Sequence, residues 1–319
     1  MSKLSKYILR RLMITIPILI GISIILFTLM NLAPGGPEAV LMGDDISAEA
    51  AARIRTNLGL DQPLPVQYMR WFSSTIRGDL GNSFRTGEPV LSALADRLPN
   101  TLILTLSAFM LSLIIAIPIG ILSAAKQYSL IDKVATFVSF IGISFPSFWL
   151  GIVLILIFAF QFRLFPASGM ATYGMEGDIL NRLHHLVLPA FTLGAVRIAT
   201  FMRFTRSGML EVLSQDYIRT ARAKGLGERV VIYKHAFRNA LISITTVIGL
   251  TIPALIGGSV LTETIFAWPG LGRMAVNAVF QRDYPVIMGV NMVVAIVTVM
   301  ANLGVDIIYT FIDPKITYN

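Results

Sequence analysis

Two side chains inside apolar runs are the first candidates for chemistry. Arg197 and Asp306 interrupt stretches that are otherwise long enough to cross a membrane, where a bare charge costs several kcal/mol. Both lie about six or seven residues from the same expected end of their helices, so similar depths are expected. They are candidates for a pair that locks two helices together or takes part in gating. The plainer alternative is that Arg197 reaches toward the membrane surface while Asp306 bonds a neighbouring helix.

The remaining reactive residue types form no recognisable catalytic or metal-binding pattern. The chain has no cysteine, and its three histidines (His184, His185 and His235) have no second ligand at metal spacing. The His-Glu-x-x-His motif, the Gly-x-Ser-x-Gly motif and the phosphate-binding loop of nucleotide hydrolases are all absent. We therefore expect no enzyme activity and no cofactor or metal on this chain. Any nucleotide hydrolysis must occur on another chain.

The most distinctive stretch is the basic segment, residues 202–240. It carries eight of the 26 Lys and Arg residues. Its pattern predicts two helical pieces joined at Gly225-Leu226-Gly227, with a membrane span on each side. Such a segment projects from one face of the bilayer and is suited to gripping a partner.

Composition places the rest of the chain in lipid. Hydrophobic residues make up 55% of the sequence and charged residues 14%, and the mean hydropathy is +0.73. A soluble domain has roughly a quarter charged residues. The net charge of +8 flanks apolar spans and serves to orient them, so no nucleic-acid partner is expected.

We predict an all-α integral membrane protein with six transmembrane helices. The first apolar run has 21 residues, which is too long for a signal peptide. Pro118, Pro146, Pro189 and Pro253 predict bends within or at the ends of spans. The expected spans are Leu12–Leu32, Thr101–Ala125, Val134–Phe162, Leu186–Phe204, Ala240–Thr262 and Pro285–Ile312.

Three parts follow from these spans. Residues 1–32 hold the N-terminus and the first helix, 33–100 a small extracytoplasmic module with a helix expected over 48–58, and 101–319 a five-helix core with a cytoplasmic loop over 205–239. With both termini inside, the inner segments hold 15 basic and 5 acidic residues, and the outer segments 10 and 12. The positive-inside rule therefore favours this orientation.

Several stretches resemble one transporter family. Tyr217–Leu226 with His235–Ala240 is similar to the EAA loop of binding-protein-dependent ABC importers, in the form found in oligopeptide, dipeptide and nickel permeases. The chain length and the long first outer loop resemble the B-type permease subunit. The other matching stretches are Gly78–Gly81, Arg97–Thr101, Glu263–Gly272, Arg282–Pro285, Asp306–Tyr309 and Asp313–Ile316.

This resemblance implies a type I importer permease fold in the cytoplasmic (inner) membrane of a prokaryote. It also implies a second homologous permease subunit, two ABC ATPase subunits that bind ATP and Mg, and an extracytoplasmic solute-binding protein. Peptides are the implied substrate, with nickel complexes or another small solute as the alternative. The implied ATPase-coupling residues are Tyr217, Arg219, Thr220, Ala221, Arg222, Ala223, Lys224, Gly225 and Leu226.

The physics of this stretch fits that role. Small residues at Ala221 and Ala223 would let a helix face lie flush in a groove on the ATPase, and Gly225 would end the helix with a positive φ. Aligned on Gly225, Arg219 and Thr220 depart from the general EAA form, as in the peptide-permease branch. A different class remains open: an ion- or proton-coupled secondary carrier that uses Arg197 and Asp306.

Overall fold

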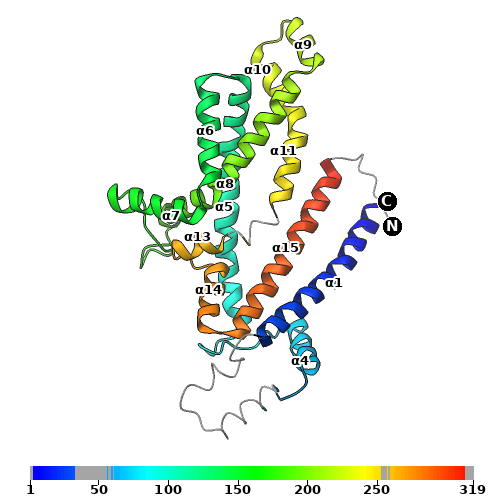
Figure 1. The fold of residues 1–319 in the computed structure, drawn as a ribbon, viewed down its shortest axis with the longest axis vertical. Helices are drawn as coiled ribbons and strands as arrows, with labels where there is room; N and C mark the ends of the chain where they lie inside the picture. The colour runs from blue at the N-terminus through cyan, green and yellow to red at the C-terminus, as the bar shows by residue number, and fades with distance from the viewer. Residues whose placement is uncertain are drawn as a thin grey trace. The chain divides into compact units, whose positions relative to one another are not determined.

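The protein is helical throughout the part described by this computed structural model, which covers residues 3–32, 56, 59, 61–252, 257 and 259–312 (Figure 1). Within it, extended pairing is limited to one bridge between Asn82 and Pro89. The helices are α1 (Lys3–Leu32), α4 (Leu64–Ile76), α5 (Val90–Ala125), α6 (Leu130–Ser144), α7 (Ser147–Leu154), the π-helix η1 (Ile155–Gln161), α8 (Ile179–Leu213), α9 (Asp216–Ala223), α10 (Glu228–Val230), the π-helix η2 (Val231–Phe237), α11 (Arg238–Thr251), α13 (Val260–Ile265), α14 (Leu271–Gln281) and α15 (Tyr284–Ile312).

Four of these helices are long and apolar enough to cross a membrane. They are α1, α5, α8 and α15, and a fifth span results if α6 and the α7–η1 helix count as one broken crossing. The described residues thus contain four such helices, or five with the bent pair, and the expected total of six transmembrane helices stays a prediction. The third breaks at Pro146, where the chain bends by 107°, because proline has no N–H to continue the helix.

The other differences from the expected spans concern where single helices begin and end. The expected fifth span is represented by α11, which has 14 residues. Pro253 lies outside the described residues. So do residues 48–55 of the expected outer helix and the stretch Asp313–Ile316. Pro118 and Pro189 lie inside α5 and α8, which continue through them. The second span begins at Val90 rather than Thr101 because Val90, Leu94 and Leu98 form an apolar stripe that packs in a core.

The described chain forms two compact units. Unit 1 comprises residues 1–101, 269–307 and 316–319, and unit 2 comprises 102–268 and 308–315. The division expected from membrane topology stays a prediction, since compactness does not report which side of a membrane a segment faces. Each unit is described by itself below.

In unit 1, hydrogen bonds tie the starts of α14 and α15 to residues much earlier in the chain. The buried carboxylate of Asp283, just before α15, accepts hydrogen bonds from the Ser83 hydroxyl and from the N–H of Phe84 at 3.1 Å. Near the start of α14, the N–H of Leu271 donates to the Thr101 hydroxyl at 2.8 Å. These bonds join residues that lie far apart in the sequence, so the pattern of apolar residues along the helices does not predict them.

Unit 2 is built on a close crossing of α5 and α8. A Cβ on Gly194 would lie 2.9 Å from the carbonyl oxygen of Ala108, and a Cβ on Gly120 would lie 2.6 Å from the Cβ of Thr205 and 2.9 Å from the carbonyl oxygen of Met202. Real side chains do not tolerate such distances, so both positions require glycine for the helices to meet. Small residues are the usual means of close helix packing in lipid.

Candidate functional site

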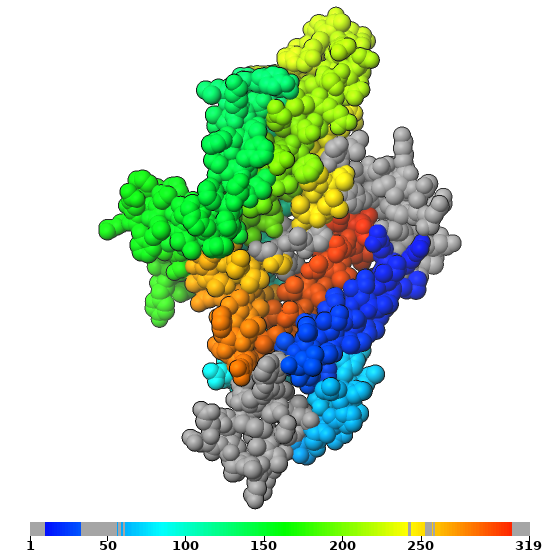
Figure 2. All heavy atoms as spheres, in the orientation of Figure 1, coloured from blue at the N-terminus to red at the C-terminus, as the bar shows by residue number. Residues whose placement is uncertain are grey.

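The basic segment projects from one end of unit 2. In Figure 1 α9 and α10 lie beyond the ends of α8 and α11, which lead into and out of the segment. In Figure 2 the same residues form a yellow-green knob at the top. Two helical pieces separated by a glycine turn, as expected from the sequence, are confirmed.

The turn after α9 depends on Gly225. Its φ is +75°, in the left-handed region. The N–H of Gly225 donates to the carbonyl of Arg222 at 2.9 Å, and the N–H of Leu226 donates to the carbonyl of Ala221 at 3.4 Å. This paired pattern is a Schellman motif, which satisfies two carbonyls at a helix end. The predicted helix end at Gly225 is confirmed.

An ion pair closes the same turn from outside. The guanidinium of Arg222 donates from Nη2 to Oε1 of Glu228 at 2.8 Å and from Nε to Oε2 at 3.2 Å. Such a two-bond arrangement fixes orientation as well as charge. Arg222 lowers the pKa of Glu228 below its ordinary value, mainly through this hydrogen bond, and Glu228 raises the pKa of Arg222. The pair joins α9 to α10 across the glycine turn.

One face of α9 is buried against the protein itself. Ile218 is 0% exposed and Ala221 7%. Because residues three apart share a helix face, the two side chains point the same way. In the isolated chain the small side chain of Ala221 lets α9 approach its own core, and a contact of Ala221 with another protein stays a prediction. The exposed members of the predicted set are Tyr217, Arg219, Thr220, Arg222, Ala223, Lys224, Gly225 and Leu226.

The core beneath α9 connects it to three long helices. Its buried members come from α5, α8, η2 and α11 as well as α9. Met209, which is 0% exposed, represents α8. Close-packed interiors transmit displacement rather than absorb it, so this core links the position of α9 to that of the other helices. The buried members are Ile121, Ala124, Met209, Ile218, Ala221, Val231, Ala236, Ala240 and Ile244.

A buried ionic cluster lies close to this core and was not foreseen from the sequence. The carboxylate of Asp132, at the start of α6, accepts from Nε and Nη2 of Arg206 on α8 at 2.6 and 2.8 Å. It also accepts from the Ser123 hydroxyl on α5 and from the N–H of Tyr128 at 2.9 Å. Four donors satisfy one buried carboxylate, which is the condition under which a buried charge is tolerated.

The sequence held a partial signal for this cluster. Ser129 caps α6 and its hydroxyl accepts from the N–H of Asp132, a spacing that marks a helix start. Nothing in the sequence pairs Asp132 with Arg206, which is 74 residues away. The cluster fastens the α5–α6 connection to α8 and so fixes where the core beneath α9 sits.

The two ionisable residues expected inside spans have other recorded partners. Nη1 of Arg197 donates to the carbonyl of Leu193 on its own helix at 3.0 Å. Asp306 forms an ion pair with Arg11 of α1 at 3.1 Å, within unit 1. Arg197 belongs to unit 2 and Asp306 to unit 1, and their pairing stays a prediction.

Comparison with known families decides the class of the protein. The family model described as "Binding-protein-dependent transport system inner membrane component" matches residues 116–318, which include the whole basic segment. The model for the N-terminal part of the same components, "Binding-prot-dependent transport system membrane comp, N-term", matches residues 4–105. The chain belongs to the binding-protein-dependent transport family.

Relatives of this permease align with it from end to end. It is 48% identical to the oligopeptide transport system permease protein AppB of Bacillus subtilis (strain 168), covering 99% of this chain and 100% of that one. It is 39% identical to the dipeptide transport system permease protein DppB of Escherichia coli (strain K12), over 98% and 99% of the two chains. The match thus includes residues 33–100 as well as the membrane helices.

A solved structure shares the permease fold. An inward-facing structure of the MetNI methionine ABC transporter superposes with a TM-score of 0.53 at 16% identity, covering 70% of this chain and 97% of that one. This permease is therefore a multi-pass inner-membrane subunit of an ABC importer and not an enzyme, because ATP hydrolysis in the family lies on separate subunits. It functions in a membrane complex with ATPase and substrate-binding partners.

Proposed function

We propose that this chain is a permease subunit through which an ATP-driven importer moves di- or oligopeptides across the cytoplasmic membrane by alternating access. The observation that carries the proposal is that the chain is 39–48% identical, over nearly its full length, to permeases named for oligopeptide and dipeptide transport. Substrate passage involves the whole membrane core, and the likeness extends over all of it.

The exposed face of α9 would contact an ATPase subunit. Arg219, Lys224 and Leu226 offer charge and apolar surface on a helix whose opposite face is anchored in the core. Closure of the nucleotide sites would push α9, and the core beneath it would pass that push to α5, α8 and α11. Tyr217, Thr220, Arg222 and Ala223 complete this face, while Ala221 and Gly225 set its shape.

The orientation and the complex follow from this role. The basic segment and both termini would lie in the cytoplasm, in accordance with the charge bias. Residues 33–100 would form an extracytoplasmic module available to the solute-binding protein. A second homologous permease would share the pathway, and two ATPase subunits would bind ATP and Mg.

Arg197 and Asp306 are proposed to pair, or to act in gating, in one state of the transport cycle. The exchange of Asp306 between Arg11 and Arg197 would then accompany helix movement. The test is a double-mutant cycle on uptake with Arg197→Ala and Asp306→Ala. A pair predicts that the double variant loses less than the two single losses combined, and strictly additive losses contradict pairing.

Uptake by the reconstituted importer tests the proposed function. The complete complex is reconstituted in vesicles and supplied with its binding protein. It is expected to transport labelled dipeptides or longer peptides only when ATP is present on the side of the membrane that carries the ATPase subunits. Catalytically inactive ATPase subunits serve as the control. Uptake of nickel complexes without peptides would identify the alternative substrate, and uptake that persists without ATP would indicate a secondary carrier.

A further inference from the structure

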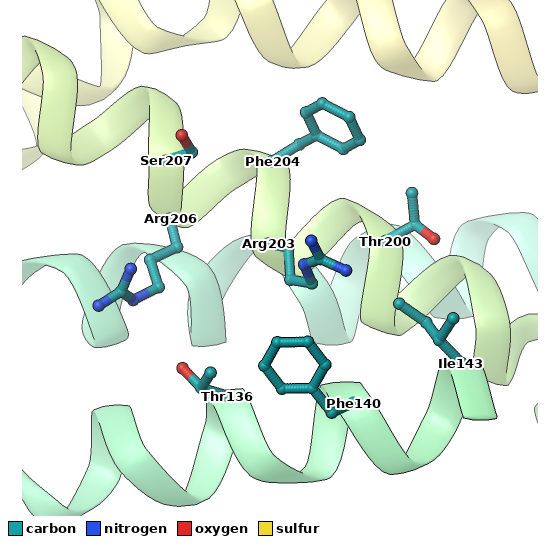
Figure 3. Close-up of a pocket in the computed structure, with 8 residues that line it drawn as sticks. All are labelled: Thr136, Phe140, Ile143, Thr200, Arg203, Phe204, Arg206 and Ser207. Atoms are coloured by element: carbon teal, nitrogen blue, oxygen red, sulfur yellow. The ribbon is translucent and has the colours of Figure 1, made fainter.

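A cationic cleft between α6 and α8 has no role in the coupling scheme. Its volume is about 410 Å³, and Arg203 and Arg206 of α8 line it opposite Phe140 and Thr136 of α6. Figure 3 shows the two arginines reaching from α8 toward α6. A second hollow of about 370 Å³ shares Thr136, Phe140 and Arg206 with the first and adds Lys133. The two hollows adjoin along α6 and are called the α6–α8 cleft.

The charge of the α6–α8 cleft is positive overall. Lys133, Arg203 and Arg206 face one acidic residue, Asp132, among the described residues that line the two hollows. Asp132 is already engaged by Arg206. In the described part of the chain, neither Arg203 nor Lys133 forms an ion pair. Two positive charges are thus left for an anionic group.

Phe140 holds Arg203 in place. The Arg203 guanidinium carbon lies 5.2 Å from the centre of the Phe140 ring, within the range of a cation–π contact. Within the described residues the Arg203 guanidinium has no carboxylate partner, so its N–H groups remain available in the cleft. A planar group with several donors suits a phosphate oxygen pair better than a single point charge does.

The surroundings of the cleft suit a lipid. Beside it α6 exposes large apolar side chains, among them Phe137 at 66% and Val138 at 58%. Lys133 is in the first turn of α6, so at 1.5 Å per residue the basic groups lie within about 15 Å of the helix start. With the start of α6 at the membrane surface, Lys133 lies in the headgroup region, which is about 5–8 Å thick on each side, and Arg203, beside Phe140, lies deeper, where the acyl chains begin. Cations at headgroup depth next to an apolar face are the pattern of an anionic lipid site.

We propose that the α6–α8 cleft binds the phosphate-bearing headgroup of an anionic phospholipid in the leaflet on the side of the basic segment. The acyl chains would lie along the exposed apolar face of α6. Because Arg206 also holds Asp132, such a lipid would sit directly against the cluster that fastens α5 and α6 to α8. The site is independent of what the importer carries, so its test does not depend on peptide uptake.

The test uses the complete transporter in nanodiscs of phosphatidylcholine with added phosphatidylglycerol, with bound lipid measured by native mass spectrometry. Wild type is expected to retain phosphatidylglycerol in preference to phosphatidylcholine. Arg203→Gln and Lys133→Gln should each weaken that binding by about fivefold, the effect of one basic residue near a membrane surface. Lys126→Gln removes an exposed charge beyond α5, outside the cleft lining, and should change binding less than twofold.

Three results would overturn the proposal. The first is the absence of any preference for phosphatidylglycerol in the complete complex, as expected if another subunit covers the cleft. Lys126→Gln could weaken binding as much as Arg203→Gln, which would mark a general surface-charge effect. Inorganic phosphate at equal concentration could displace the lipid, which would identify a free-anion site. Thermal unfolding in phosphatidylcholine alone, expected to be unchanged in Arg203→Gln, separates lost binding from misfolding.

Discussion

Replacement of Gly225 by valine tests whether the α9 turn is needed for coupling. Gly225 has φ +75°, and a Cβ there would meet nothing within 4 Å. Any effect of the substitution therefore comes from backbone strain and not from a clash. Gly227 provides a matched control, because its φ is −61° and a Cβ there also meets open space.

The size of the effect follows from the turn geometry. A left-handed conformation costs an L-residue about 1–2 kcal/mol, and valine is among the least tolerant. If the turn relaxes instead, the two Schellman hydrogen bonds are lost, at about 1 kcal/mol each. Either route weakens the native turn by about 2 kcal/mol, which is roughly a 30-fold change in its population. Gly227→Val should cost almost nothing at this φ.

Hydrogen exchange and transport together form the assay. In the complete complex, the amides of Gly225→Val at positions 225 and 226 should exchange up to about 30-fold faster than in wild type. Peptide uptake and its stimulation of ATP hydrolysis should fall, with unchanged amounts of assembled complex. Gly227→Val should match wild type in all three measurements.

Two results would refute this reasoning at different steps. Equal exchange in Gly225→Val and Gly227→Val would show that the positive φ does not stabilise the turn. Faster exchange with normal uptake and normal ATPase stimulation would show that the turn forms as described but does not couple the subunits.

Three further predictions concern the neighbouring residues. Asp132→Asn should destabilise the protein by about 2–3 kcal/mol in thermal unfolding, because it leaves Arg206 without its charged acceptor. Adding Arg206→Gln to the Asp132→Asn variant should cause little further loss of stability. Fully additive losses from the two substitutions would rule out the pair. The Arg222–Glu228 pair should stabilise the turn fully above pH 4.5, the ordinary pKa of a glutamate, and lose this effect as the pH falls through the lowered pKa of Glu228. Hydrogen exchange of the α9 amides, corrected for intrinsic rates, should show this step. The Glu228→Gln variant should lack it. Ala221→Asp should reduce the amount of folded permease in size-exclusion profiles, since it buries a charge. The matched control Ala223→Asp, at an exposed position, should leave that amount unchanged. Equal amounts of the two variants would contradict the burial of Ala221.

Local chemistry predicted much of the candidate site. Gly225 was expected to end a helix with positive φ, and the structure has that turn, because glycine alone adopts it without strain. The long apolar runs predicted the helices α1, α5, α8 and α15, since only a helix satisfies its own backbone in lipid. These features depend on residues within a turn or two of each other.

Other features depended on distant parts of the chain. Proline permits either a kink or a break, and only the folded chain shows that the helix pair around Pro146 is bent by 107°. The early start of α5 followed from an apolar stripe, Val90, Leu94 and Leu98, which has meaning only once its partner surface exists.

The basic segment shows the same division. By itself the sequence determined that residues 202–240 form two helical pieces hinged at glycine, because charge, periodicity and φ preferences are local properties. The tertiary structure alone decided that Ala221 faces inward and that Asp132 clamps Arg206 across 74 residues. Burial and ion pairing are properties of surfaces brought together in space, so no local pattern in the chain encodes them.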